Sequence, residues 1–100
     1  MITVGLHVRI EAKPDKVDEV EAMLTAAVEK VKKEEGTTIW LALRLGPTSF
    51  AVVDAFPDDA GRHAHLTANA DALTHAAQDL LAQPPNFERK DVIAAKLPTQ

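Results

Sequence analysis

The chain has 100 residues, 46% hydrophobic and 26% charged, a composition typical of a soluble globular protein with room for one core. We therefore predict a single domain over residues 1–100. The net charge of −4 argues against a nucleic-acid partner, and the lack of cysteine excludes disulfides and thiolate metal sites.

The first two predicted elements are a strand and a helix. Residues 1–12 alternate between apolar and polar side chains, which predicts a half-buried strand. Pro14 and Asp15 then offer a helix start with Asp15 as N-cap, and Gly36 offers a C-terminal stop. Apolar residues between them recur at three- and four-residue steps and form one stripe: Val17, Val20, Leu24, Ala27, Val28 and Val31.

The remaining pattern predicts a hairpin, a second helix and a last strand. Residues 37–45 and 50–56 are predicted strands, joined by the turn residues 46–49. Asp58 and Asp59 open the next helix, which ends before the prolines at 84 and 85. Its expected buried stripe is Leu66, Ala70, Leu73, Ala77 and Leu80. Residues 87–97 are predicted to form the final strand, and residues 98–100 to fray.

The order β-α-β-β-α-β predicts an α+β, ferredoxin-like fold, with two helices on one face of a four-stranded antiparallel sheet. A chain of this length has no third layer for the opposite face, where His7 and Arg9 would share the surface with large apolar side chains. Exposed apolar sheet indicates a partner, so we expect a symmetric homodimer with the two sheets facing each other.

No part of the sequence indicates a membrane or a secretory leader. The N-terminus lacks a basic start and a long apolar stretch, and no run approaches the ~18 apolar residues of a membrane span. We therefore expect a cytoplasmic protein.

Asp54 is the most informative candidate for a site, because it shares a strand face with three large apolar residues. If that face is buried, the carboxylate needs a hydrogen-bonding or charged partner. Arg62 or a histidine in the first turns of the following helix could reach it. Two interpretations stay open at this point: an acid that orients a histidine base, and a junction ion pair that anchors the helix.

Two histidines follow in that helix, at positions 63 and 65. Residues two apart point in nearly opposite directions, so His63 and His65 cannot share a metal ion. His63 lies near one edge of the apolar stripe, and His65 lies beyond the other edge, beside Asn69. Either histidine could face a pocket between helix and sheet, or simply bond to a backbone carbonyl or water. No histidine pair has zinc-like spacing with a third ligand, so no metal site is predicted.

Trp40 and Arg44 share one face of the predicted 37–45 strand. A single Trp is usually a core residue, although it could also form the flat wall of a site for an aromatic ligand. The sequence has no tyrosine, and no phosphate-binding glycine loop or serine-hydrolase motif.

The segments LHVRIEAKPDKVDEVEAML and WLALRLGPTSFAVVDAFPDDAGRHAHL resemble antibiotic biosynthesis monooxygenase-type domains over residues 2–97. His65 falls on that family's histidine, and Asp54 lies near its strand-end acid. The resemblance implies a dimeric α/β barrel built from ferredoxin-like protomers. It also implies oxidation of a phenolic or quinol-type aromatic molecule with O2, without a metal or flavin cofactor.

Strand faces and this resemblance together suggest a division of roles. A neutral His65 would act as the base, Asp54 would orient it, and Arg44 would stabilise the substrate anion. Trp40 and Phe56 would be stacking walls, with His63 and Asn69 as further binding residues. The alternatives are a non-catalytic small-molecule-binding or stress-response barrel, and a haem-degrading relative.

Overall fold

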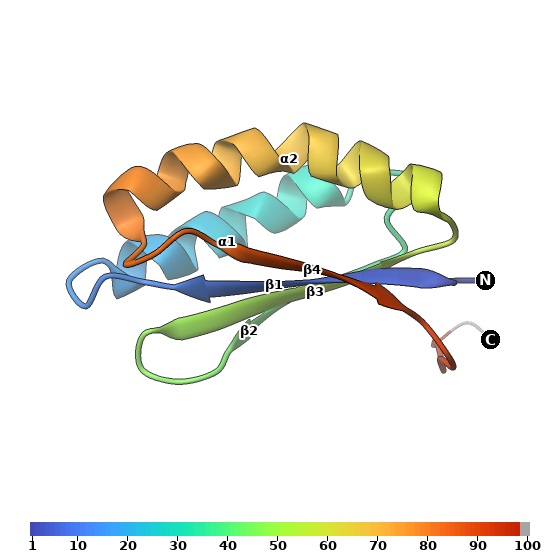
Figure 1. The fold of residues 1–100 in the computed structure, drawn as a ribbon, viewed down its shortest axis with the longest axis horizontal. Helices are drawn as coiled ribbons and strands as arrows, with labels where there is room; N and C mark the ends of the chain where they lie inside the picture. The colour runs from blue at the N-terminus through green and yellow to red at the C-terminus, as the bar shows by residue number, and fades with distance from the viewer. Residues whose placement is uncertain (99–100) are drawn as a thin grey trace.

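The computed structural model describes residues 1–98, and these residues form four strands and two helices in the predicted order. The strands are β1 (Val4–Glu11), β2 (Ile39–Arg44), β3 (Ser49–Phe56) and β4 (Asn86–Asp91). The helices are α1 (Val17–Val31) and α2 (Asp59–Leu80). Both helices cover the same face of the sheet (Figure 1). The predicted ferredoxin-like fold is thus confirmed.

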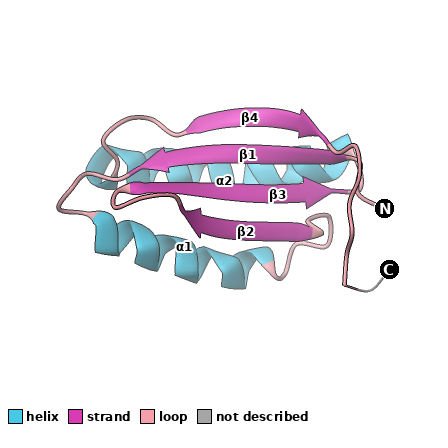
Figure 2. Ribbon diagram, turned by 90° about the horizontal axis from the view of Figure 1, so that it is seen from below, coloured by secondary structure: helices cyan, strands magenta, loops and turns pink. Residues whose placement is uncertain are grey.

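The sheet is antiparallel throughout, with the strand order β2-β3-β1-β4 (Figure 2). The two central strands are therefore β1 and β3. Their register places Leu6 opposite Asp54, and Trp40 of β2 lies opposite Asp54 on the other side. Residues directly opposite each other in a sheet project from the same face. Asp54 is consequently flanked by a leucine and a tryptophan on the face that the helices cover.

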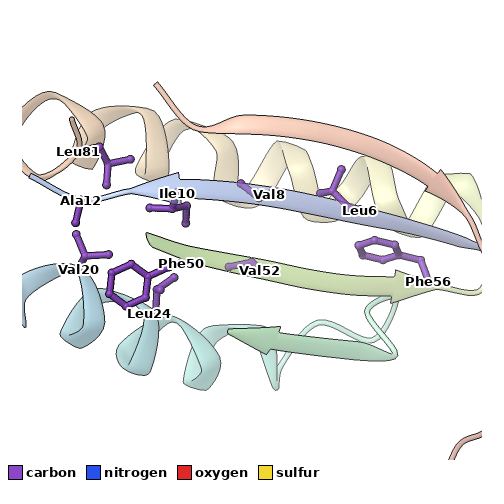
Figure 3. Close-up of a cluster of buried hydrophobic side chains, with 10 residues drawn as sticks. All are labelled: Leu6, Val8, Ile10, Ala12, Val20, Leu24, Phe50, Val52, Phe56 and Leu81. Carbon is purple, nitrogen blue, oxygen red and sulfur yellow. The ribbon is translucent and has the colours of Figure 1, made fainter. Parts of the chain in front are cut away.

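The core lies between this face and the helices (Figure 3). Alternate residues of the central strands point into it, as the period-two pattern predicts. Apolar residues of both helices close it from above, which fixes the position of the helices over the sheet. The buried cluster consists of Leu6, Val8, Ile10, Ala12, Val20, Leu24, Phe50, Val52, Phe56 and Leu81.

Two ends of elements differ most from the prediction. The first helix ends at Val31 rather than near Gly36, because the amides of Lys33 and Glu34 bond three residues back in tightened turns. β4 ends at Asp91 rather than at residue 97: Asp91 pairs with Val4, the first residue of β1, and the pairing closes with a hydrogen bond from the Val92 amide to the Thr3 carbonyl. Of the residues predicted to fray, 99 and 100 lie outside the described part of the chain.

Of the two predicted helix caps, one is wrong and one is confirmed. The expected cap at Asp15 is wrong: Lys16 holds the N-cap position of α1, and its side chain makes no capping bond. At α2 the prediction is confirmed, because the Asp58 carboxylate accepts a 2.9 Å hydrogen bond from the amide of Gly61. An acidic cap satisfies an amide that the helix itself leaves without a partner.

The sheet face away from the helices has an apolar half, on β2 and β3, and a polar half, on β1 and β4. β2 presents Leu41 and Leu43, which are 52% and 41% exposed, next to Val53 of β3. β1 and β4 present polar side chains, among them His7, whose Nδ1 lies 3.5 Å from a carboxylate oxygen of Glu88. Neither helix within residues 1–98 has the length and apolar character needed to cross a membrane.

The Asp58 cap makes a direct prediction about stability. We expect Asp58→Ala to lower the free energy of unfolding by about 1 kcal/mol, because the Gly61 amide loses its acceptor. Asp15→Ala is the matched control and should change stability by less than about 0.5 kcal/mol, since Asp15 caps no helix. Urea unfolding measures both values. Equal losses in the two variants would contradict this account of the α2 cap.

Candidate functional site

A cavity of about 430 Å³ lies between the sheet and the two helices. Its walls are mostly aliphatic, with Leu6, Val8 and Val52 from the sheet and leucines and alanines from the helices. Five polar or amphipathic side chains also line it: Lys30, Trp40, Asp54, His65 and Asn69. A concave apolar space of this size with a few convergent polar groups is the usual form of a small-molecule site.

Asp54 is the most unusual of these residues, since its side chain is fully buried. Oδ2 lies 2.8 Å from Nε2 of His65, which is ion-pair distance. Within residues 1–98, however, neither carboxylate oxygen has a partner in hydrogen-bond geometry, so the imidazole N–H does not point directly at Oδ2. A buried carboxylate normally has its oxygens bonded. Asp54 therefore offers acceptor capacity beside the cavity that it lines.

His65 lies between two carboxylates. Its Nε2 faces Asp54, and its Nδ1 lies 2.5 Å from Oε1 of Glu34. The Asn69 side-chain amide donates to Oε2 of Glu34 at 2.9 Å and to the backbone carbonyl of His65 at 2.8 Å. Thr37 donates to Oε1 of Glu34 at 2.9 Å. The imidazole is thus held by groups from the α1–β2 loop, from β3 and from its own helix.

The two carboxylates set the charge of the ring. Burial alone would lower the pKa of His65, but the contacts with Asp54 and Glu34 outweigh it and raise that pKa. Burial would likewise raise the pKa of Glu34, but hydrogen bonds from Asn69, His65 and Thr37 outweigh it and lower that pKa. Both shifts favour an imidazolium between two carboxylates. This geometry does not fit the neutral His65 of the sequence-based mechanism.

Two glycines hold the loop that carries Glu34 against the first turn of α2. A Cβ on Gly61 would lie 2.8 Å from the carbonyl oxygen of Gly36, and a Cβ on Gly36 would lie 3.2 Å from Cα of Gly61. Only residues without a side chain allow this approach. The glycine contact thereby brings Glu34 within reach of a histidine that is 31 residues further along the chain.

The structure brings four of the predicted site residues to one cavity: Trp40, Asp54, His65 and Asn69. The sequence-based expectation that a histidine of the following helix reaches Asp54 is met by His65. Arg62, the other residue considered, instead donates to the carbonyls of Gly5 and Lys90 and pairs with Asp59.

Three predicted residues lie elsewhere. Arg44 pairs with Glu21 at 2.9 Å, stacks over the Phe50 ring and lines a different hollow at the edge of α1 and β2. His63 is exposed and lines a third hollow beside Asp59 and Arg89, because the residue two positions from a buried one faces the other way.

Phe56 is fully buried and packs on the imidazole of His65, with ring centroids 5.5 Å apart. It does not line the cavity and so supports the histidine from behind instead of forming a wall.

Sequence reasoning missed Glu34 and Lys30. Glu34 follows a cluster of lysines in a loop, where an acid ordinarily faces solvent, and no local pattern links it to His65. Lys30 lies in the last turn of α1, where a cation is favoured by the helix dipole alone. Both contacts depend on how α1 and α2 lie side by side, which the spacing within either helix does not contain.

Among solved structures, the chain is similar over 98% of its length to the NE2512 protein of unknown function from Nitrosomonas europaea. The identity is 46%, the TM-score is 0.94, and 96% of that chain is covered. A candidate antibiotic biosynthesis monooxygenase from the same organism is 19% identical, with a TM-score of 0.80 and 91% and 90% of the two chains covered.

A Streptomyces coelicolor monooxygenase from the gene ActVA-Orf6, in complex with the ligand Nanaomycin D, is 15% identical. Its TM-score is 0.76, with 97% and 93% of the two chains covered. At these two lower identities the likeness concerns the fold. No protein-family model and no curated protein matched the sequence.

The buried charge cluster predicts a titration that can be measured by NMR of the imidazole protons. We expect the pKa of His65 to lie above that of an ordinary histidine and to fall in Glu34→Gln, which removes one carboxylate but keeps the side-chain shape. Glu35→Gln changes an exposed neighbour and should leave this pKa unchanged.

The same shift links stability to pH. Because the pKa of His65 is raised on folding, its stabilising contribution is present below the ordinary histidine pKa and is lost as pH rises through the raised value. The stability gap between wild type and Glu34→Gln should therefore be widest at mildly acidic pH and shrink at alkaline pH. A gap that grows toward alkaline pH would contradict the assigned charges.

Proposed function

Because the chain belongs to the family of the Nitrosomonas europaea NE2512 protein and has the fold of antibiotic biosynthesis monooxygenase-type domains, we propose that it is a cofactor-independent monooxygenase. Its substrate is a phenolic or quinol-type aromatic molecule, and its oxidant is O2. The observation that carries the proposal is the buried Asp54 carboxylate, which lacks a hydrogen-bonded partner among residues 1–98 and lines an apolar cavity beside His65.

The cavity is suited to a small aromatic ligand. Its volume of about 430 Å³ lies within the range for small-molecule sites, and aliphatic walls favour an apolar body. Trp40, opposite Asp54 in the sheet register, offers a flat surface for an aromatic ring next to the carboxylate. A hydroxyl on the ligand supplies the hydrogen that the Asp54 oxygens lack.

The chemistry then begins with a proton transfer inside a water-poor space. Asp54 accepts the phenolic or enolic hydroxyl proton, and the adjacent His65 imidazolium stabilises the organic anion that forms. The anion is the reductant: it gives an electron to O2, recombination at carbon forms a peroxide anion, and the proton held by Asp54 returns to give the hydroperoxide. Loss of water leaves a carbonyl, so that a CH2 group and O2 become C=O and H2O. Glu34 and Asn69 act by holding His65 in place.

The geometry does not favour the haem-degrading alternative. An axial histidine needs one ring nitrogen directed at the iron. In His65 both ring nitrogens face carboxylates, Glu34 on one side and Asp54 on the other. The alternative of a binding protein without catalysis uses the same cavity and is separated from the oxygenase by oxygen consumption.

The proposed assembly is a homodimer that buries the open face of the sheet. Leu41 and Leu43 of β2 are large, apolar and about half exposed there, and Val53 adjoins them. Monomeric proteins seldom leave a continuous apolar surface on a sheet without a partner. A second copy brings an identical surface, and a twofold axis lets the apolar half of each face meet that of its partner.

Oxygen uptake over a panel of phenols, reduced quinols and anthrones tests the activity. We expect Asp54→Asn and His65→Ala each to lower the rate by about 10²–10⁴-fold, because each removes a proton acceptor or the charge that supports it. His63→Ala is the matched control, since His63 is exposed and lies outside the cavity. Circular dichroism confirms that each variant is folded.

Two results would contradict the proposed monooxygenase activity. One is a wild-type rate in folded Asp54→Asn. The other is ligand binding, seen as a change in emission of the single tryptophan, with no oxygen consumption from any compound of the panel. The second result would make the protein a binding module.

Light scattering coupled to gel filtration tests the homodimer. We expect wild type at twice the 10.8 kDa mass of the chain, and the double variant Leu41→Lys/Leu43→Lys at the mass of one chain. Thr67→Lys/Thr74→Lys adds the same charge to exposed positions of α2 and should stay dimeric. Wild type that runs as one chain at micromolar concentration would refute the assembly.

A further inference from the structure

The cavity opens to solvent between the two helices. α1 contributes Ala26 and α2 contributes Ala72 to its lining, and both alanines are also exposed at the molecular surface. Residues that both line a cavity and are exposed to solvent lie at its mouth. Both helices lie over the same face of the sheet (Figure 1). Alanine side chains end at Cβ, so these positions of the two helices leave the cavity open.

Lys30 is the one lysine of this lining, and it lies at the mouth. It is exposed, it belongs to the last turn of α1, and its Nζ donates a 2.8 Å hydrogen bond across to the backbone carbonyl of Ala68 on α2. An ammonium group has three donors, and the Ala68 carbonyl takes one and carries no charge. None of the ion pairs formed within residues 1–98 includes Lys30.

The distance between mouth and carboxylate is short. Ala68 follows His65 by three residues, which is about one turn of α2 and a rise of roughly 4.5 Å. His65 in turn contacts Asp54. An aromatic molecule that places a hydroxyl at Asp54 therefore has its other end near Lys30.

We propose that Lys30 is a specificity-determining residue, and that the cavity takes a hydroxylated aromatic molecule bearing a carboxylate at its outer end. This inference rests on the proposed function, since it assigns the inner end of the ligand to Asp54.

Charge fixes the direction of such a ligand. Asp54 lines the inner end of the cavity, and Glu34 contacts His65 from outside the lining. Two carboxylates around one imidazolium leave an excess of negative charge, which repels an anionic substituent. The mouth carries the Lys30 ammonium, which attracts it. The carboxylate consequently stays outside and the hydroxyl enters. Without Lys30, no attraction at the mouth favours the anionic ligand over its neutral analogue. The two affinities then differ only by the repulsion between the ligand carboxylate and the carboxylates near the inner end of the cavity.

Calorimetric titration with 6-hydroxy-2-naphthoate and with 2-naphthol tests the assignment. We expect wild type to bind the carboxylate more tightly, by about two- to fivefold, which is the effect of one partly exposed charge pair. Lys30→Met keeps the apolar stem and removes the charge, so it should abolish the preference while 2-naphthol binds as before. Lys30→Arg should retain the preference. Lys33→Met removes an exposed lysine outside the cavity lining and is the matched control.

The outcomes separate this inference from the function on which it rests. If wild type binds both compounds equally, or if Lys30→Met weakens both by the same factor, Lys30 has only a structural role and the inference is overturned while the cavity remains a ligand site. If neither compound binds, the proposed site itself is wrong. If wild type prefers the carboxylate but consumes no oxygen, the role of Lys30 in specificity is supported and the proposed monooxygenase activity is refuted.

Discussion

The buried carboxylate of Asp54 is the constraint on which the rest of the site depends. A carboxylate taken out of water is costly unless a counter-charge or hydrogen-bond donors replace the lost hydration. Here His65 supplies the counter-charge at 2.8 Å, and Glu34 keeps that imidazole charged from its other side. Glu34 reaches His65 only because Gly36 and Gly61 let the α1–β2 loop approach α2. One charge in β3 thus constrains residues in the α1–β2 loop and in α2.

The arrangement gives Asp54 a counter-charge but no hydrogen-bond donor among residues 1–98, and the proposed function depends on these free acceptor sites. A purely structural anchor would give both oxygens hydrogen-bond donors, as Glu34 receives from Asn69 and Thr37. Asp54 has instead a close cation and open acceptor sites beside an apolar space. Such a group lies next to an imidazolium and can still accept a proton or a hydrogen bond from a ligand. The alanines of α1 and α2 keep the path to it open.

Much of the fold follows from sequence pattern, and only part of the site does. Period-two alternation places the strands, and Asp58 shows its cap in the local sequence, because both signals act over a few residues. The pairing of Asp54 with a histidine is also visible, since a buried acid requires a partner nearby. Glu34 was not predictable, because its role depends on the close contact of two glycines that lie 25 positions apart in the chain. Arg44 was misplaced for a related reason: sharing a strand face with Trp40 does not decide whether its long side chain turns inward or pairs with Glu21 of α1.

The most direct measurement of the central claim is a crystal structure of the protein with 2-naphthol bound. The account predicts the ring against Trp40 within the cavity and the hydroxyl oxygen within about 3 Å of an Asp54 carboxylate oxygen. A ligand held in the same cavity with its hydroxyl toward solvent, and Asp54 untouched, would contradict it. In that case the Asp54–His65 pair would be a structural anchor, and the chemistry assigned to it would have no basis.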